Sequence, residues 1–240
     1  RLTDLMELLG DTADRTGADL VGGLTSSRGQ MPQIATGVGQ RGLSGVLFAD
    51  DLPVAVALSQ GCAPIGPART VTRAERNVVH TLDGMPALEA LKDDLGVTDL
   101  AELKRSIGAV HVALPVPGHV AGDYMVRNLM GADVETGVVA IGAAVDPGAR
   151  LAFCRRDADS AERDLRRMLA ELRRRLDGPP KGGIYVSCLA RGPNMFGAPS
   201  RELAILAEEL GDFPVAGFFA NGEICGGRLY GYTGVLTLFI

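Results

Sequence analysis

The first group of side chains that could do chemistry follows an apolar run at residues 184–188. Ser187, Cys188, Arg191 and Gly192 come at the end of this run, where the chain is expected to turn. An arginine carries a planar, permanently charged guanidinium group that suits a carboxylate or a phosphate. We therefore expect Arg191 to bind the negative group of a ligand. In the structural alternative, Cys188 is a small core residue and Arg191 is the partner of a buried carboxylate.

A second group lies at the end of another apolar run, within residues 215–223. Phe218, Asn221 and Glu223 place an aromatic ring, an amide and a carboxylate close together on a stretch flanked by glycines. Such a set could bind the apolar body of a ligand together with its amine. In the alternative interpretation, one of Phe218 and Phe219 is a core residue and the other an edge residue, and Glu223 pairs with Arg191.

The third group is Arg127 with Asn128, which follows a glycine-containing stretch. Adjacent arginine and asparagine side chains can bind a carboxylate, and Arg127 is the second candidate for the negative group of a ligand. The same two side chains can instead satisfy the polar groups of a buried loop.

Motifs for nucleophilic catalysis are missing from the sequence, which has no G-x-S-x-G, P-loop or H-E-x-x-H pattern. Its three histidines are His80, His111 and His119. A catalytic dyad of Cys188 with one of them stays open, because catalytic partners need not be adjacent in sequence. His119 lies in a Pro-Gly-His loop, where it could bind haem iron or simply face solvent.

These groups must be positioned by a framework of strands and helices. The apolar pattern predicts an α/β fold with mixed β-sheets and flanking helices. A capping box at Asp159–Glu162 predicts the N-terminus of the strongest helix, and Leu2–Leu9 predicts a helix interrupted at Gly10. Further expected elements are short helices at 86–95 and 98–107, a helix at 203–210, strands at 20–23, 109–114, 183–188, 215–219 and 234–239, and hairpins at 43–58 and 138–155.

Two distant segments share one order of elements, namely helix, buried strand, glycine-rich loop and strand. They cover residues 2–48 and 203–239, and we interpret them as two related halves from an internal duplication. The second half has a further strand, at 183–188, before its helix. The equivalent strand of the first half would precede residue 1, so we expect the first half to be truncated.

Composition excludes several classes of protein. The 240 residues carry 24 basic and 29 acidic side chains and a net charge of −5, which gives no general attraction to nucleic acid. No apolar run is long enough to span a membrane, and the 46% hydrophobic content does not fit a disordered chain. The four cysteines are scattered and form no C-x-x-C pair, so we expect no zinc site and a cytoplasmic, reduced protein.

At these motifs the chain resembles the FIST sensory domain, which consists of paired N- and C-terminal FIST regions. The matching stretches follow the family's order and span nearly the whole chain. They are Leu58-Ser-Gln-Gly-Cys-Ala-Pro-Ile-Gly66, Val71-Thr-Arg-Ala74, Leu82-Asp-Gly-Met-Pro-Ala-Leu88, Gly122-Asp-Tyr-Met-Val-Arg-Asn128, Phe153-Cys-Arg-Arg-Asp-Ala158, Ser187-Cys-Leu-Ala-Arg-Gly192 and Val215-Ala-Gly-Phe-Phe-Ala-Asn-Gly-Glu223.

The resemblance implies a cytoplasmic small-ligand-binding domain of a signal-transduction protein, one that senses an amino acid or a similar metabolite. It implies residues 1–82 as the C-terminal part of a FIST N-like domain and residues 83–240 as a FIST C-like domain. The family's N-terminal region normally begins well before residue 1, so the start of that region is expected to be missing. Some family members resemble haem-based nitric oxide sensors, which keeps haem as a minority alternative to a site without a cofactor.

The prediction is therefore a non-enzymatic sensory domain with a small-molecule ligand, a signalling protein as a further partner, and no nucleic acid, membrane or metal. Three alternatives stay open: a hydrolase or transferase with Cys188 as nucleophile, a haem-based gas sensor, and a protein-interaction scaffold. The expected ligand-binding residues are Arg127, Asn128, Ser187, Cys188, Arg191, Gly192, Phe218, Asn221 and Glu223.

Overall fold

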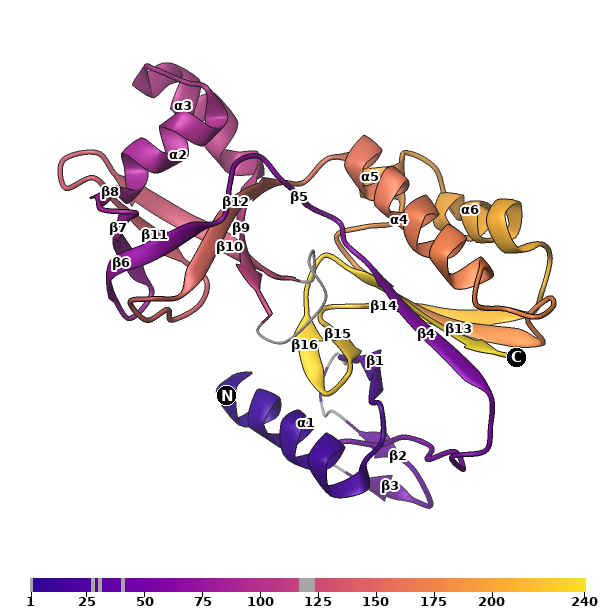
Figure 1. Ribbon diagram of the computed structural model, residues 1–240. Coiled ribbons are helices and arrows are strands. Elements are labelled where there is room, and N and C mark those ends of the chain that lie inside the picture. The colour runs from indigo at the N-terminus through magenta and orange to yellow at the C-terminus, as the bar shows by residue number, and fades with distance from the viewer. Residues whose placement is uncertain (1, 27–28, 30–31, 40–41, 117–123) are drawn as a thin grey trace. The chain divides into compact units, whose positions relative to one another are not determined.

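The computed structural model describes residues 2–26, 29, 32–39, 42–116 and 124–240. Its contacts divide the chain into two compact units. The discontinuous unit consists of Arg1–Gly61 and Glu162–Ile240, and the inserted unit of Cys62–Ala161. Each unit is built around its own sheet, as Figure 1 shows. The expected domain boundary between residues 82 and 83 stays a prediction.

The main sheet of the discontinuous unit has the strand order β14-β13-β17-β4. Strands β13 and β14 run parallel, whereas β17 is antiparallel to both β13 and β4. A sheet with both kinds of pairing, flanked by helices, confirms the predicted α/β class. The strands are β4 (Val54–Ser59), β13 (Gly182–Cys188), β14 (Val215–Ala220) and β17 (Gly234–Phe239).

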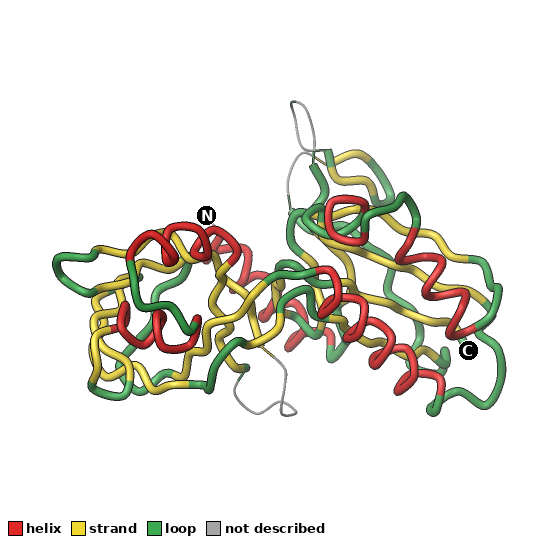
Figure 2. Tube along the Cα trace, turned by 90° about the horizontal axis from the view of Figure 1, so that it is seen from above, coloured by secondary structure: helices red, strands yellow, loops and turns green. Residues whose placement is uncertain are grey.

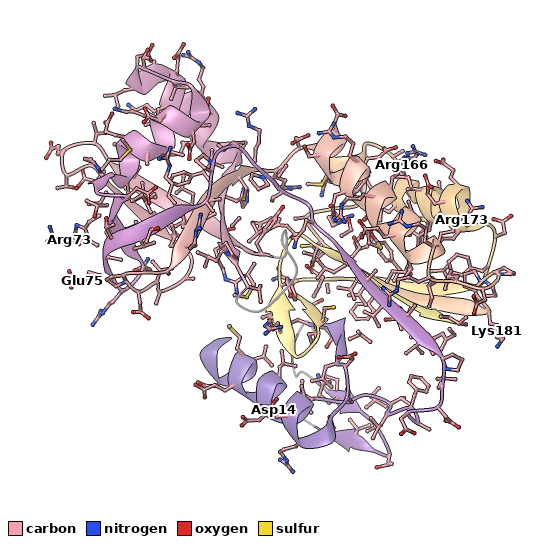
Figure 3. The ribbon with its side chains drawn as sticks, in the orientation of Figure 1. Asp14, Arg73, Glu75, Arg166, Arg173 and Lys181 are labelled. Atoms are coloured by element: carbon pink, nitrogen blue, oxygen red, sulfur yellow. The ribbon has the colours of Figure 1, made fainter. Side chains whose placement is uncertain are left out.

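Helices α4 (Ala158–Arg173) and α6 (Arg201–Leu210) pack on one face of this sheet. Their apolar stripes, at a spacing of three and four residues, meet the strands around the buried side chains Leu169, Ile205 and Leu236. Ion pairs join the helices above this core. Arg166 of α4 reaches both Glu208 and Glu209 of α6, and Arg166 and Arg173 can be followed along α4 in Figure 3.

Smaller elements complete the discontinuous unit. A three-stranded sheet has the order β1-β15-β16, and helix α1 packs against it through Leu9, Ile224 and Leu229. A short turn of helix, α5, follows β13. The bounds are α1 (Leu2–Thr16), β1 (Val21–Gly23), β2 (Gln33–Ile34), β3 (Val38–Gly39), β15 (Glu223–Cys225), β16 (Arg228–Tyr230) and α5 (Pro193–Phe196).

The inserted unit is built on six strands that close into a ring, in the order β11-β10-β9-β12-β6-β7, because β7 pairs with β11. Helix α2 packs against the core of this unit through Leu88 and Leu91. Figure 2 shows the helices and strands of the protein from above. The bounds are β5 (Ala63–Pro64), β6 (Arg69–Glu75), β7 (Val78–Leu82), β8 (Met85–Pro86), α2 (Ala87–Leu95), α3 (Leu100–Ser106), the 3-10 turn η1 (Ile107–Ala109), β9 (Val110–Pro115), β10 (Tyr124–Asp133), β11 (Val138–Ile141) and β12 (Arg150–Arg155).

Both predicted hairpins are wrong in their pairing. Residues 43–49 form no strand beside β4, and β11 pairs with β10 and β7 rather than with β12. The turn residues are suited to a hairpin, but strand partners are decided by long-range packing that turn chemistry does not contain. The internal duplication is not confirmed either, because β1 pairs antiparallel with β15 whereas its supposed counterpart β14 pairs parallel with β13.

Two predicted helix boundaries are also corrected. Helix α1 continues through Gly10 to Thr16, since one glycine costs only about 1 kcal/mol in a helix that packs through Leu9. The side chain that caps α4 is Asp157, whose Oδ1 accepts the backbone N–H of Ser160 at 2.8 Å, and not Asp159 of the expected capping box.

The core of the discontinuous unit gives a first prediction. Leu169 on α4 is fully buried, so Leu169→Ala should lower the free energy of unfolding by about 2–5 kcal/mol. Leu189→Ala removes the same atoms from a side chain that is 53% exposed, and it should change the free energy of unfolding by about 0.5 kcal/mol or less. Urea denaturation measures both, and equal losses would contradict this assignment of the core.

Candidate functional site

A pocket of about 330 Å³ lies within the discontinuous unit. Strand β14 forms one wall, and the turn after β13 and the beginning of α6 form the other. Ser187, Gly192 and Phe218 of the expected ligand-binding set line it. Tyr185 lies beside Ser187 because alternate side chains of a strand share a face.

Two glycines give this pocket its shape. Gly192 has a φ of +55°, and a Cβ there would lie 2.9 Å from the ring of Phe219. Gly217 of β14 approaches β13 so closely that a Cβ would lie 1.9 Å from the carbonyl oxygen of Tyr185. Larger residues at either position would displace the wall, which explains why the sequence places glycine in these two stretches.

A buried ion pair joins Arg191 to Glu202, and of these two residues Glu202 lines the pocket. Arg191 is completely buried, and its Nε donates to Oε1 of Glu202 at 2.8 Å. Its guanidinium group also lies 5.2 Å from the centre of the Phe196 ring. Its terminal nitrogens donate to the carbonyl and hydroxyl oxygens of Ser59 and reach the hydroxyl of Tyr185 at 3.5 Å.

The Glu202 carboxylate accepts several further hydrogen bonds. The hydroxyl of Tyr185 donates at 2.7 Å and that of Ser187 at 3.0 Å, and the backbone N–H of Gly192 donates at 3.1 Å. Burial raises the pKa of Tyr185, so its hydroxyl stays protonated and can donate. Burial alone would lower the pKa of Arg191, but Tyr185 and Glu202 outweigh it and hold that pKa above its ordinary value. Glu202, and not Glu223, is thus the carboxylate that pairs with Arg191.

Cys188 and Glu223 form a separate buried cluster with Thr233. Glu223 is fully buried, and its Oε2 accepts the backbone N–H of Thr233 at 3.1 Å and its hydroxyl at 2.9 Å. Burial raises the pKa of Glu223 and outweighs these hydrogen bonds, which lower it. Burial, together with the charge of Glu223, also raises the pKa of the Cys188 thiol. A thiol of this kind is a poor nucleophile at neutral pH.

The other expected residues are not among those that line the pocket. Arg127 and Asn128 are on β10 of the inserted unit, where Arg127 donates to the carbonyl oxygen of Val126 at 2.9 Å. Burial lowers the pKa of Arg127. Asn221 is exposed between β14 and β15. His119 falls outside the described residues. The expectation that all of these residues bind the ligand stays a prediction.

Eleven of the fourteen residues that line the pocket were not in the expected set, among them Tyr185, Arg201, Glu202 and Phe219. The two-residue period of a strand could have identified Tyr185, because Tyr185 precedes Ser187 by two residues and therefore lies on the same strand face. Glu202 gave no such signal, because an acidic residue in the first turn of a helix is common on electrostatic grounds alone.

The buried ion pair gives a second prediction. Glu202→Gln leaves the Arg191 charge buried without a carboxylate, which should cost about 3–5 kcal/mol of the free energy of unfolding. Glu162→Gln makes the same change in a one-third-exposed carboxylate that pairs with Arg166 and Arg201 and should cost about 1 kcal/mol or less. Chemical denaturation checks both, and a cost for Glu202→Gln no larger than that of the control would contradict the role of the pair.

The Glu223 cluster gives a third prediction. Because the pKa of Glu223 is raised in the folded protein, the stability that this group contributes is fully present below its ordinary value of 4.5. It is lost as the pH rises through the raised pKa. We therefore expect the free energy of unfolding of the wild type, minus that of Glu223→Gln, to fall between pH 4.5 and neutrality.

Glu208 supplies the control for this pH dependence. Hydrogen bonds from Arg166 and Arg201 lower its pKa, so its contribution is present above the ordinary value of 4.5 and is lost as the pH falls through the lowered pKa. The difference between wild type and Glu208→Gln should therefore rise with pH. A difference for Glu223→Gln that is independent of pH, or that rises, would show that its pKa is not raised.

Among the described residues, no helix is both long enough and apolar enough to cross a membrane. Within the same ranges, no three or more His, Cys, Asp or Glu side chains are grouped so that they could hold a metal ion.

Comparison with known proteins connects the chain to one family. Residues 1–85 match the FIST N domain and residues 87–226 match the FIST C domain. An uncharacterized protein of Mycobacterium tuberculosis H37Rv is 40% identical over 209 residues, which cover 83% of this chain and 54% of that protein. An uncharacterized protein of Mycobacterium bovis is 36% identical over 191 residues, which cover 76% of this chain and 50% of that protein.

The chain therefore spans about half the length of the curated relatives that it matches. The two family matches together extend over nearly all of its residues, in the order that the motifs predicted. This chain belongs to the FIST family of signal-transduction sensory domains.

Proposed function

We propose that this chain is the cytoplasmic, small-ligand-binding part of a signal-transduction protein and that it binds an amino acid or a similar small metabolite. The pocket beside β14 carries this proposal. Its volume of about 330 Å³ is at the lower end of the range for ligand sites, which supports a small metabolite.

The lining of the pocket supports a ligand with an apolar body and a polar end. Val215 and Phe219 of β14 and Leu203 of α6 offer apolar surface, and Ser187 and Arg201 offer polar groups. This division of the lining is typical of small-molecule sites, in which a few polar groups fix the orientation of the ligand.

We propose that the site works without a cofactor and without covalent catalysis. No His, Cys or Met is among the described residues that line the pocket, and the hydroxyl of Tyr185 is bonded to Glu202, so the side chains that usually hold haem iron do not fit there. The raised pKa of Cys188 argues against the nucleophile alternative.

A protein-interaction scaffold is the second candidate. One observation favours it, namely that Val46, Leu47 and Phe48 expose more than half of their apolar side chains. Exposed apolar groups that gather in one place often mark a contact with a protein partner. A pocket that binds no small molecule would support the scaffold function.

Calorimetric titration with the twenty proteinogenic amino acids tests the proposal. We expect at least one of them to bind, and Phe219→Ala to weaken that binding roughly ten-fold or more because the apolar wall is lost. Phe48→Ala is the matched control, since Phe48 and Phe219 are each 52% exposed and Phe48 does not line the pocket. Binding that is absent, or that both variants weaken equally, would refute the proposed site.

A further inference from the structure

Two of the four cysteines lie side by side in the inserted unit. Strand β5 pairs antiparallel with the end of β12, so that Pro64 is opposite Cys154 and Ala63 is opposite Arg155. Residues directly opposite each other in such a pair share a face, and so do residues two positions apart on one strand. Cys62, two residues before Pro64, therefore falls on the same face as Cys154. A hydrogen bond joins the two thiol groups.

Both thiols are inside the protein and are held there by the same unit. The exposed fraction is 3% for Cys62 and 0% for Cys154. The hydroxyl of Tyr124 on β10 donates to the carbonyl oxygen of Cys62. The backbone N–H of Ile65 donates to the carbonyl oxygen of Phe153 on β12 at 2.9 Å. All of these residues belong to the inserted unit, so its own fold keeps the two sulfur atoms together.

The surroundings of the pair suit thiol chemistry. Leu151 and Phe153 of β12 belong to the apolar core, so Cys154 faces the other side of the strand. His111 shares that side, because it is directly opposite Cys154 on β9. Burial lowers the pKa of His111, and so does the nearby charge of Arg156, which keeps the imidazole neutral at neutral pH. A positive charge favours a thiolate, and a neutral imidazole can accept the proton of a thiol.

The two sulfur atoms have different parts in the contact. The hydrogen bond to Cys62 raises the pKa of Cys154, and burial raises it further, so Cys154 keeps its proton. Cys154 is thus the thiol that donates, and Cys62 is the sulfur that accepts. Cys62 is therefore the sulfur that reacts first with an electrophile. Cys154 is already in contact with it, and this proximity compensates for the small thiolate fraction of Cys154 in a second step.

We propose that Cys62 and Cys154 are a redox-sensitive dithiol that a peroxide converts into a disulfide. The sulfur of Cys62 attacks one oxygen of hydrogen peroxide, the O–O bond breaks, and the other oxygen leaves as water with the thiol proton. Cys62 is then a sulfenic acid. The sulfur of Cys154 attacks the Cys62 sulfur, the S–S bond forms, and the sulfenic hydroxyl leaves with the Cys154 proton as a second water. Two electrons pass from the dithiol to the peroxide, and a reducing dithiol returns them by thiol–disulfide exchange.

The disulfide would close almost the whole inserted unit into one loop. Cys62 is the first residue of that unit, which ends at Ala161, and Cys154 is on its last strand. A cross-link across a long loop restricts the unfolded chain and so favours the folded state. Oxidation should therefore make the unit harder to unfold. The proposal goes beyond the proposed function, because neither cysteine lines the pocket and the reaction needs no ligand there.

Intact-mass measurement of the full chain, reduced with dithiothreitol and then treated with hydrogen peroxide, tests the proposal. We expect a loss of about 2 Da, for two hydrogen atoms, which dithiothreitol reverses. A peptide map without reductant should show one link, between the peptides that contain Cys62 and Cys154. The same treatment in urea should link the four cysteines in a mixture of pairs, because only the folded chain holds this pair together.

Variants assign the two steps. Cys154→Ser should stop the reaction at the sulfenic acid of Cys62, which dimedone labels, and Cys62→Ser should abolish the loss of mass. Cys188→Ser and Cys225→Ser are the matched controls and should form the link as fast as the wild type. Oxidation should raise the midpoint of thermal unfolding of the wild type by about 5 °C or more and leave that of Cys62→Ser nearly unchanged.

Several results would overturn the proposal, and the map of the wild type gives them even if a variant does not fold. One is a gain of about 16 or 32 Da at a cysteine without any link, since this means that the sulfur atoms oxidise separately. Another is a link between any other pair of cysteines in the folded chain, or between two chains. A third is a Cys62–Cys154 link that forms no faster in the folded chain than in urea. None of these results bears on the titration with amino acids, so the proposed function stands or falls separately.

Discussion

The buried pair of Arg191 and Glu202 is the constraint on which the site depends. It joins the turn after β13 to the first turn of α6, and these two segments form one wall of the pocket. Taking two opposite charges out of water costs several kcal/mol for each ion, and their attraction compensates only when the remaining hydrogen bonds are also made. Tyr185, Ser187, Gly192 and Ser59 supply those bonds. The pair therefore fixes the geometry of this wall more than it adds net stability.

This arrangement also decides what a ligand meets. The carboxylate of Glu202 already accepts bonds from Tyr185, Ser187, Arg191 and Gly192, so it presents a satisfied floor and not a free negative charge. The guanidinium group of Arg191 is equally occupied and has no exposed surface. The polar group that reaches the rim of the pocket is Arg201, whose surface ion pairs leave donors unused.

How much of this could be predicted from the sequence depends on the range of the interaction. Strands β13, β14 and β17 and helix α6 were predicted correctly because their apolar pattern is local and has a clear period. The partner of Arg191 was beyond such reasoning. The chain has 29 acidic residues, and only the path of the backbone brings Glu202 rather than Glu223 to the guanidinium group. The predicted hairpin at 138–155 failed for the same reason, since β11 pairs with β7, a segment about 60 residues away.

A sensory domain must convert binding into a change of contacts, because a ligand shifts an equilibrium only by its different affinity for the two states. Arg201 lines the pocket and also pairs with Glu162 of α4 and Glu208 of α6. Arg201 therefore links one wall of the pocket to the contact between the two helices. A ligand that displaced its side chain would also break the ion pair with Glu162 that joins α4 and α6 above the sheet.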